Sequence, residues 1–241
     1  MNKGIIGLLA AVVVVIVGLY AGFGMKETQE AVSSVDRHQT TTVSAAEPAA
    51  GEPAAANGNA VDAPAKTYIM GSPDAPVKIK EFASLSCSHC AHFHKETFPQ
   101  IKKDLIDTGK VQFEFVNFPL NAPAMDGALV ALCMPEERYH QFISFLFEQQ
   151  DKWAFDQNSR QILKQNAKLL GASEDKLDAC LNNEDMKQGI VSRMQEAQKA
   201  YNIQSTPSFV INDKETFSGA LEYPDFKKKV EAHMQQEKVE Q

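Results

Sequence analysis

Two cysteines separated by two residues are the part of this chain best suited to chemistry. They frame the run Cys87-Ser88-His89-Cys90, which follows an alternating, strand-like segment and begins a helix-like one. A cysteine at the start of a helix gains from free backbone N–H groups and from the positive end of the helix dipole, which lower its pKa and favour the reactive thiolate. Protonated His89 would add positive charge beside it. The pattern indicates thiol-disulfide exchange, although two cysteines at this spacing also supply half of a zinc site.

The same segment supports a rival interpretation, a copper- or zinc-handling module. Five potential metal ligands lie close together in the sequence: Cys87, His89, Cys90, His92 and His94. In a helix that begins near Cys87, however, Cys87, Cys90 and His94 share one face, while His89 and His92 project away from it. We therefore expect neither a metal nor another cofactor, and we interpret His92 and His94 as solvated helix residues. A third interpretation is a binding module with an idle dithiol.

A strand ahead of the dithiol positions an acidic residue. The run from Val77 to Glu81 alternates with period two, so Val77, Ile79 and Glu81 share one face of a strand. Glu81 then points inward. A buried carboxylate near the dithiol would have a raised pKa and could shuttle a proton while a mixed disulfide resolves. The alternative is an edge residue that faces water.

The remaining patterns predict two halves of an α/β fold around a helical segment. After Cys90 the apolar spacing predicts a helix kinked at Pro99, then a strand over 111–118. Residues 208–211 read as a strand, followed by a turn, a short strand near 216–217 and a helix from about Tyr223. Between the halves, residues 120–204 read as several helices.

The N-terminal part of the chain predicts export. Gly4 to Met25 is an unbroken run of apolar and small residues, long enough to span a bilayer. We expect residues 1–26 to be a membrane anchor, or otherwise a long signal segment that is cleaved. Residues 27–65 lack Phe, Trp and Tyr and read as a disordered linker, and 66–241 as one domain. The net charge of −7 and the lack of a basic cluster argue against nucleic acid as a partner.

Together these features resemble the DsbA family of periplasmic thiol oxidases in the thioredoxin superfamily. The strand, the helix that opens on C-x-x-C and the later β-β-α unit match a thioredoxin fold, and the helical insertion distinguishes the family from thioredoxin itself. The resemblance implies that Cys87 is the nucleophile and Cys90 the buried resolving thiol. It also implies that Pro207 is a cis-proline beside the cysteines, and that Glu81 is the buried acid.

The resemblance further implies a function for the chain. The expected activity is the introduction of disulfides into newly exported, cysteine-containing proteins in the periplasm, by a monomer that a DsbB-like, quinone-linked membrane protein reoxidises. Two departures leave a disulfide isomerase or reductase as the alternative. Strongly oxidising members carry Pro where this chain has Ser88, and Val where it has Thr206. Isomerases generally pair through an N-terminal dimerisation domain, and residues 27–65 look too disordered to be one.

Two further cysteines, Cys133 and Cys180, fall within the helical segment. In an oxidising compartment they can bond to each other, and some members of the family carry a second disulfide there. The alternative is two separate buried thiols that pack as small hydrophobic side chains.

Overall fold

The computed structural model describes residues 67–239, and the segments expected to be an anchor and a linker, 1–26 and 27–65, lie outside this range. The described residues lie within one compact unit. None of the helices between residues 67 and 239 is long and apolar enough to cross a membrane.

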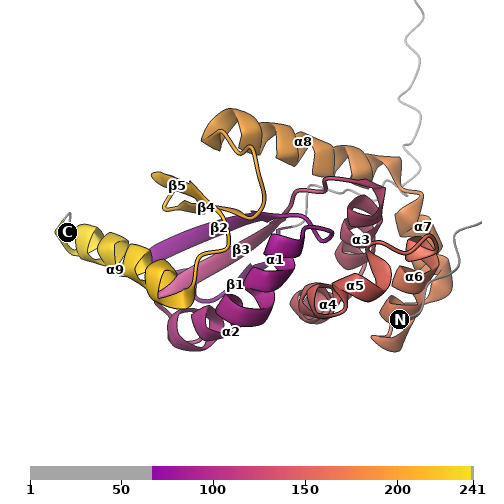
Figure 1. The fold of residues 1–241 in the computed structure, drawn as a ribbon, viewed down its shortest axis with the longest axis horizontal. Coiled ribbons are helices and arrows are strands. Elements are labelled where there is room, and N and C mark those ends of the chain that lie inside the picture. The colour runs from indigo at the N-terminus through magenta and orange to yellow at the C-terminus, as the bar shows by residue number, and fades with distance from the viewer. Residues whose placement is uncertain (1–66, 240–241) are drawn as a thin grey trace, which may run out of the picture. The chain divides into compact units, whose positions relative to one another are not determined.

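A five-stranded sheet forms the centre of the described unit, in the order β1-β3-β2-β4-β5 (Figure 1). β2 and β3 run parallel, and the other neighbouring pairs are antiparallel. The strands are β1 (Ile69–Met70), β2 (Val77–Ala83), β3 (Val111–Asn117), β4 (Ser208–Ile211) and β5 (Glu215–Ser218). The short edge strand β1 was not predicted from the sequence, because two residues are too few to show a period.

Helices cover both faces of this sheet. A helical segment after β2 and the C-terminal helix α9 (Tyr223–Val239) pack on one face, with Phe93, Phe98 and Phe226 in their shared core. On the other face lies α8 (Glu184–Tyr201), whose Ala197 packs against apolar side chains of β2, β3 and β4. The two predicted halves therefore share one sheet.

The helical segment after β2 is interrupted twice by wider π-helical turns. It comprises α1 (Ser88–His92), η1 (Phe93–Thr97), α2 (Phe98–Ile101) and η2 (Lys102–Ile106). The sequence predicted an interruption at Pro99, which lies in the first turn of α2, directly after the first π-helical turn. Proline has no N–H to donate to the preceding turn, and a π-helical turn is one way for a helix to accommodate the missing hydrogen bond.

The helical insertion has its own core, which continues into the region of the dithiol. Its helices are α3 (Ala122–Leu132), α4 (Glu136–Glu148), α5 (Gln150–Trp153), α6 (Ser159–Leu169) and α7 (Glu174–Leu181). Leu146, Phe147 and Trp153 pack in one buried cluster with Cys90 and with Phe115 of β3. The predicted fold class, a thioredoxin fold with a helical insertion between its halves, is confirmed.

Candidate active site

The dithiol lies where β2 passes into α1, as the alternating strand and the following helix predicted. Cys87 is the residue before the first helical position, and its backbone N–H donates to the Ser84 carbonyl at 3.0 Å. Its side chain is partly exposed, whereas Cys90 is completely buried. Both cysteines are present as free thiols. A substrate sulfur can therefore reach Cys87, while Cys90 is accessible only from within the protein.

The surroundings of Cys87 favour its thiolate. They lower the pKa of Cys87 from 9.0 to about 5, chiefly through a hydrogen bond from the Cys90 thiol, with partial burial opposing the shift. The Thr206 side chain and the backbone amides of Cys90 and His89 contribute further. The contribution of His89 thus comes from its backbone N–H, and its side chain is exposed. The sequence also predicted a lowered pKa for Cys87, but the largest cause of the lowering is the hydrogen bond from the Cys90 thiol.

Cys90 is shifted in the opposite direction. Burial raises the pKa of the Cys90 thiol far above its ordinary value, and the neighbouring Cys87 sulfur and the charge of Glu81 add to the increase. One thiol of the pair is therefore ionised at neutral pH while the other keeps its proton. This difference gives the two sulfurs distinct chemical capacities, a nucleophile and leaving group at Cys87 and a proton-bearing thiol at Cys90.

The loop before β4 brings Thr206 and Pro207 beside Cys87. The Thr206–Pro207 peptide bond is cis. The Cys87 thiol donates to the Thr206 carbonyl oxygen at 3.3 Å, across 119 positions of sequence. The Thr206 hydroxyl oxygen is buried, and within residues 67–239 it has no hydrogen-bond partner. It can donate to the Cys87 sulfur once that sulfur is ionised, which agrees with its effect on the pKa of Cys87.

Glu81 and His94 form a buried pair beneath the dithiol. The Glu81 side chain is completely buried, and His94 Nε2 lies 2.9 Å from one of its carboxylate oxygens and 3.1 Å from the other. The prediction that Glu81 points inward agrees with this position. The interpretation of His94 as a solvated helix residue is wrong, because its side chain is only 4% exposed. His92 is exposed, with Nε2 3.8 Å from the Glu222 carboxylate.

Gln150 of α5 holds the loop between β2 and α1, which carries Cys87, and this role was not predicted from the sequence. Its side-chain amide donates to the carbonyl oxygens of Leu85, at 2.8 Å, and Cys87, at 3.0 Å. Gln150 is 4% exposed, so these bonds are largely shielded from water. No local pattern marks the residue, since it lies 63 positions after Cys87 and its role depends on how the insertion packs.

The other two cysteines form a disulfide within the helical insertion. Cys133, directly after α3, is bonded to Cys180 in α7, and their Cα atoms are 6.3 Å apart. Both residues are buried. The sequence is compatible with either a bond between them or two separate thiols, and the structure has the bonded form.

No metal-binding group is found within the described part of the chain: between residues 67 and 239, no three His, Cys, Asp or Glu side chains are arranged to hold an ion. His94 faces Glu81, His89 is exposed, and the two thiols contact each other. The five potential metal ligands between Cys87 and His94 therefore do not converge on one ion.

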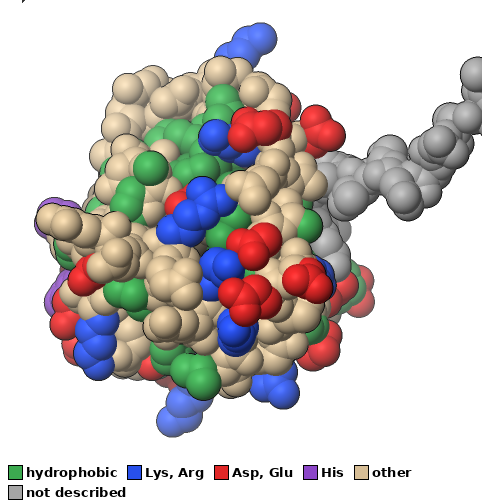
Figure 2. All heavy atoms as spheres, turned by 90° about the vertical axis from the view of Figure 1, so that its right-hand side faces the viewer, with side chains coloured by type: hydrophobic (Ala, Val, Ile, Leu, Met, Phe, Trp, Pro, Cys, Tyr) green, Lys and Arg blue, Asp and Glu red, His purple; other side chains and the backbone are tan. Residues whose placement is uncertain are grey.

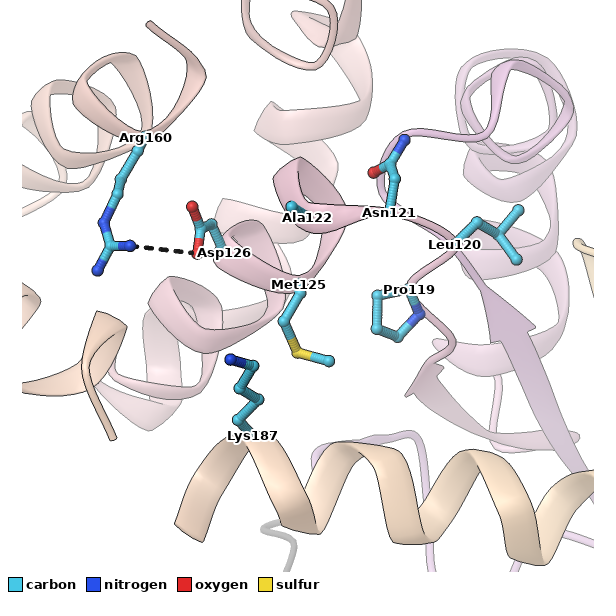
Figure 3. A pocket seen from close by; sticks show the side chains of 8 residues that line it. All are labelled: Pro119, Leu120, Asn121, Ala122, Met125, Asp126, Arg160 and Lys187. Atoms are coloured by element: carbon cyan, nitrogen blue, oxygen red, sulfur yellow. Dashed lines mark ion pairs between the residues drawn. The ribbon is translucent and has the colours of Figure 1, made fainter. Parts of the chain in front are cut away.

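A pocket of about 460 Å³ lies between the segment that leads into α3, the first turns of α3, and the starts of α6 and α8 (Figure 3). One of its lining residues, Leu120, contacts the loop between β2 and α1, because its backbone N–H donates to the Ser84 hydroxyl at 3.3 Å. The face on that side of the molecule carries mixed acidic and basic side chains beside apolar ones (Figure 2). Leu120 is 58% exposed at the pocket rim, which gives the pocket an apolar edge. The lining residues are Pro119, Leu120, Asn121, Ala122, Met125, Asp126, Arg160 and Lys187.

Comparisons with known proteins agree with this geometry. The profile of the family described as Thioredoxin matches residues 64–232. The chain is 31% identical over 149 residues to a putative protein-disulfide oxidoreductase of Rickettsia typhi, covering 61% of this chain and 55% of that protein. It is 28% identical over 176 residues to disulfide bond formation protein D of Bacillus subtilis, covering 69% of this chain and 76% of that protein.

Solved structures of similar proteins include alpha-DsbA1 from Wolbachia pipientis. That structure superposes with a TM-score of 0.68 at 29% identity and covers 73% of this chain and 94% of that one. The structural neighbours thus include DsbA proteins. This chain spans only about half of the Rickettsia relatives, 55% in the case of the Rickettsia typhi protein.

Proposed function

We propose that this chain, which belongs to the thioredoxin family, is an enzyme, a protein thiol-disulfide oxidoreductase that introduces disulfides into exported proteins. The observation that carries the proposal is the opposite shift of two adjacent thiols. The half-exposed Cys87 has a pKa of about 5, and the buried Cys90 has a raised one. A stabilised Cys87 thiolate favours the reduced dithiol and so makes its disulfide a better oxidant.

The proposed cycle begins with the Cys87–Cys90 disulfide. A substrate thiolate attacks the Cys87 sulfur, the bond between Cys87 and Cys90 breaks, and Cys90 leaves as a thiolate that takes up a proton. A second substrate thiolate then attacks the first substrate sulfur. The substrate disulfide forms, Cys87 leaves as a thiolate, and two electrons have passed from the substrate to the dithiol.

Other residues support this cycle in the proposal. The Thr206 carbonyl, beside Pro207, contacts the sulfur that carries the substrate, the Thr206 hydroxyl can donate to that sulfur when it is ionised, and Glu81 exchanges a proton with Cys90. The His89 backbone amide helps to stabilise the Cys87 thiolate.

The test is oxidation of a reduced, unfolded protein by the oxidised chain, followed by acid quenching and mass spectrometry to count disulfides. We expect rapid, stoichiometric disulfide formation by the wild type and none by Cys87→Ala, the matched control. A wild-type rate of disulfide formation equal to that of the control would refute the proposal.

A disulfide isomerase is the second candidate, and Thr206 is the observation that favours it. Thr at this position is familiar in isomerases, and here its hydroxyl can donate to the Cys87 thiolate that substrate release regenerates. We favour the oxidase because the stabilised Cys87 thiolate makes the Cys87–Cys90 disulfide a better oxidant. Efficient repair of a scrambled substrate by the wild type, together with a dimer in solution, would reverse this preference.

We further propose that the enzyme works in the periplasm, tethered to the inner membrane by the apolar run from Gly4 to Met25 through the linker over 27–65. A DsbB-like membrane protein that passes electrons to quinone is the proposed reoxidant. Fractionation of cells that express the full chain tests the tether. We expect it in the membrane fraction with Met1 to Lys26 intact, whereas a shortened chain in the soluble fraction would indicate a cleaved signal segment.

A further inference from the structure

His94 is a buried titratable group that the cycle above does not use. Its imidazole stacks on Phe147 of α4, with ring centroids 4.2 Å apart and an interplanar angle of 18°. Phe98 of α2 and Phe115 of β3 complete an aromatic enclosure, with centroids at 4.8 and 5.8 Å. Within this enclosure the only polar atoms that the structure bonds to His94, among the described residues, are the carboxylate oxygens of Glu81.

The position of the proton on His94 follows from its second nitrogen. Nδ1 is buried and has no hydrogen-bond partner within residues 67–239. If Nδ1 carried a proton, a buried N–H donor would be left unpaired, which is rarer in proteins than an unpaired acceptor and costs about 1–3 kcal/mol. The proton therefore belongs on Nε2, where it is donated to Glu81.

Glu81 is close enough to Cys90 for its charge to raise the pKa of that thiol. Cys90 and two of the rings around His94, Phe115 and Phe147, belong to one buried cluster. The carboxylate thus lies in the environment of Cys90 and can accept a proton when Cys90 must become a thiolate. Without a donor, a completely buried carboxylate would tend to be protonated already and could not accept.

We propose that His94 is a positioning residue that keeps the Glu81 carboxylate ionised and aimed, so that Glu81 accepts the Cys90 proton when Cys90 attacks a mixed disulfide. In this step the Cys90 S–H proton moves to Glu81. The Cys90 thiolate bonds to the Cys87 sulfur, and the bond from Cys87 to the partner sulfur breaks. The partner leaves as a thiolate, so the partner is reduced and the dithiol is oxidised. This inference rests on the proposed function and adds a residue to it.

The test follows the reaction of the reduced protein with oxidised glutathione, with acid quenching and mass spectrometry. Cys87 forms the mixed disulfide, and Cys90 then releases glutathione. We expect His94→Phe to slow the release by about 100-fold, the low end of what positioned proton transfer contributes. Formation of the mixed disulfide should keep its wild-type rate, because His94 is not among the groups that set the pKa of Cys87. His94→Gln, which retains an N–H donor, should restore most of the rate.

A pH profile between about 5 and 9.0 gives a readout that a merely structural role would not move. The titratable groups near His94 are Glu81 on β2, Cys90 on α1 and His140 on α4. Burial lowers the pKa of His140 to about 4, so His140 stays neutral over this range. In His94→Phe the release step should need a higher pH than in the wild type. A release rate equal to wild type at every pH would overturn the inference.

A second comparison covers the case in which His94→Phe unfolds because Glu81 is left buried without a partner. Glu81→Gln and the double variant Glu81→Gln/His94→Phe both lack the buried charge. If His94 acts only through Glu81, the two variants should release glutathione at the same rate, and a slower double variant would contradict the proposal. A wild type that never releases glutathione would instead refute the proposed function itself.

Discussion

Replacing Cys90 with Ala should raise the pKa of Cys87, because the hydrogen bond from the Cys90 thiol is the largest cause of its low value. A hydrogen bond to a charged group is worth about 1.5–3 kcal/mol, and 1.36 kcal/mol corresponds to one pKa unit, so the expected increase is about one to two. Solvent screening at the half-exposed Cys87 favours the lower end. From about 5 in the wild type, the pKa should therefore rise to about 6 to 7.

The assay is the rate of Cys87 alkylation as a function of pH, together with the ultraviolet absorbance of the thiolate. Cys90→Ser is the matched control, since its hydroxyl can still donate to the thiolate and should keep the pKa nearer to 5. Identical values in the Ala and Ser variants would show that the backbone amides at the helix start dominate. A wild-type value near that of an ordinary thiol, 9.0, would refute the reasoning altogether.

The same pKa fixes how the oxidising power should depend on pH. The Cys87 thiolate stabilises the reduced protein, so this gain is complete above pH 9.0 and is lost as the pH falls through about 5. At pH 7, a Cys87 pKa of about 5 in place of 9.0 would stabilise the reduced protein by about 2.7 kcal/mol without screening. Solvent screening lowers this by about half, to ~1.4 kcal/mol, which makes the disulfide more oxidising by ~30 mV. A redox titration against glutathione at several pH values checks this, and a potential independent of the Cys87 ionisation would contradict it.

Three further variants test the rest of the site. Replacing Cys133 and Cys180 together with Ala should lower the free energy of unfolding by about 4 kcal/mol, the chain-entropy value for a separation of 47 residues, and leave the dithiol active. Thr206→Val keeps the carbonyl contact but removes the hydroxyl, so the pKa of Cys87 should rise and mixed disulfides should persist longer, as mass spectrometry after acid quenching would show. Gln150→Met leaves the buried Leu85 carbonyl without its donor and the Cys87 carbonyl with only the Ala91 N–H, and it should cost about 1–3 kcal/mol in denaturant unfolding.

Each of these variants has its own control or contrary outcome. Two free thiols in denatured, oxidised wild-type protein would rule out the Cys133–Cys180 bond. An unchanged Cys87 pKa in Thr206→Val would mean that the hydroxyl does not reach the thiolate. For Gln150→Met the control is Gln161→Met on the exposed side of α6, which should leave stability unchanged. Equal losses in both variants would show that the hydrogen bonds of Gln150 contribute little.

The dithiol could be predicted from the sequence because its properties are mostly local. A strand with period two, followed at once by a helix, fixes where Cys87 and Cys90 lie relative to the helix start. His94 shows the limit of such reasoning. Helical spacing correctly placed it on the face of Cys90, but whether that face meets water depends on α4, which contributes Phe147 and begins 42 positions after His94. No local pattern contains this information.

The contacts of Phe147 and Gln150 give the helical insertion a part in the chemistry. Phe147 stacks on the imidazole that holds Glu81, and Gln150, three residues later, bonds to the backbone of Cys87. The end of α4 thus reaches the surroundings of the buried Cys90, through the Glu81–His94 pair. The start of α5 reaches the partly exposed Cys87, through the Cys87 carbonyl. We therefore expect a change in how the insertion packs to alter both thiols together, which makes the insertion part of the candidate active site.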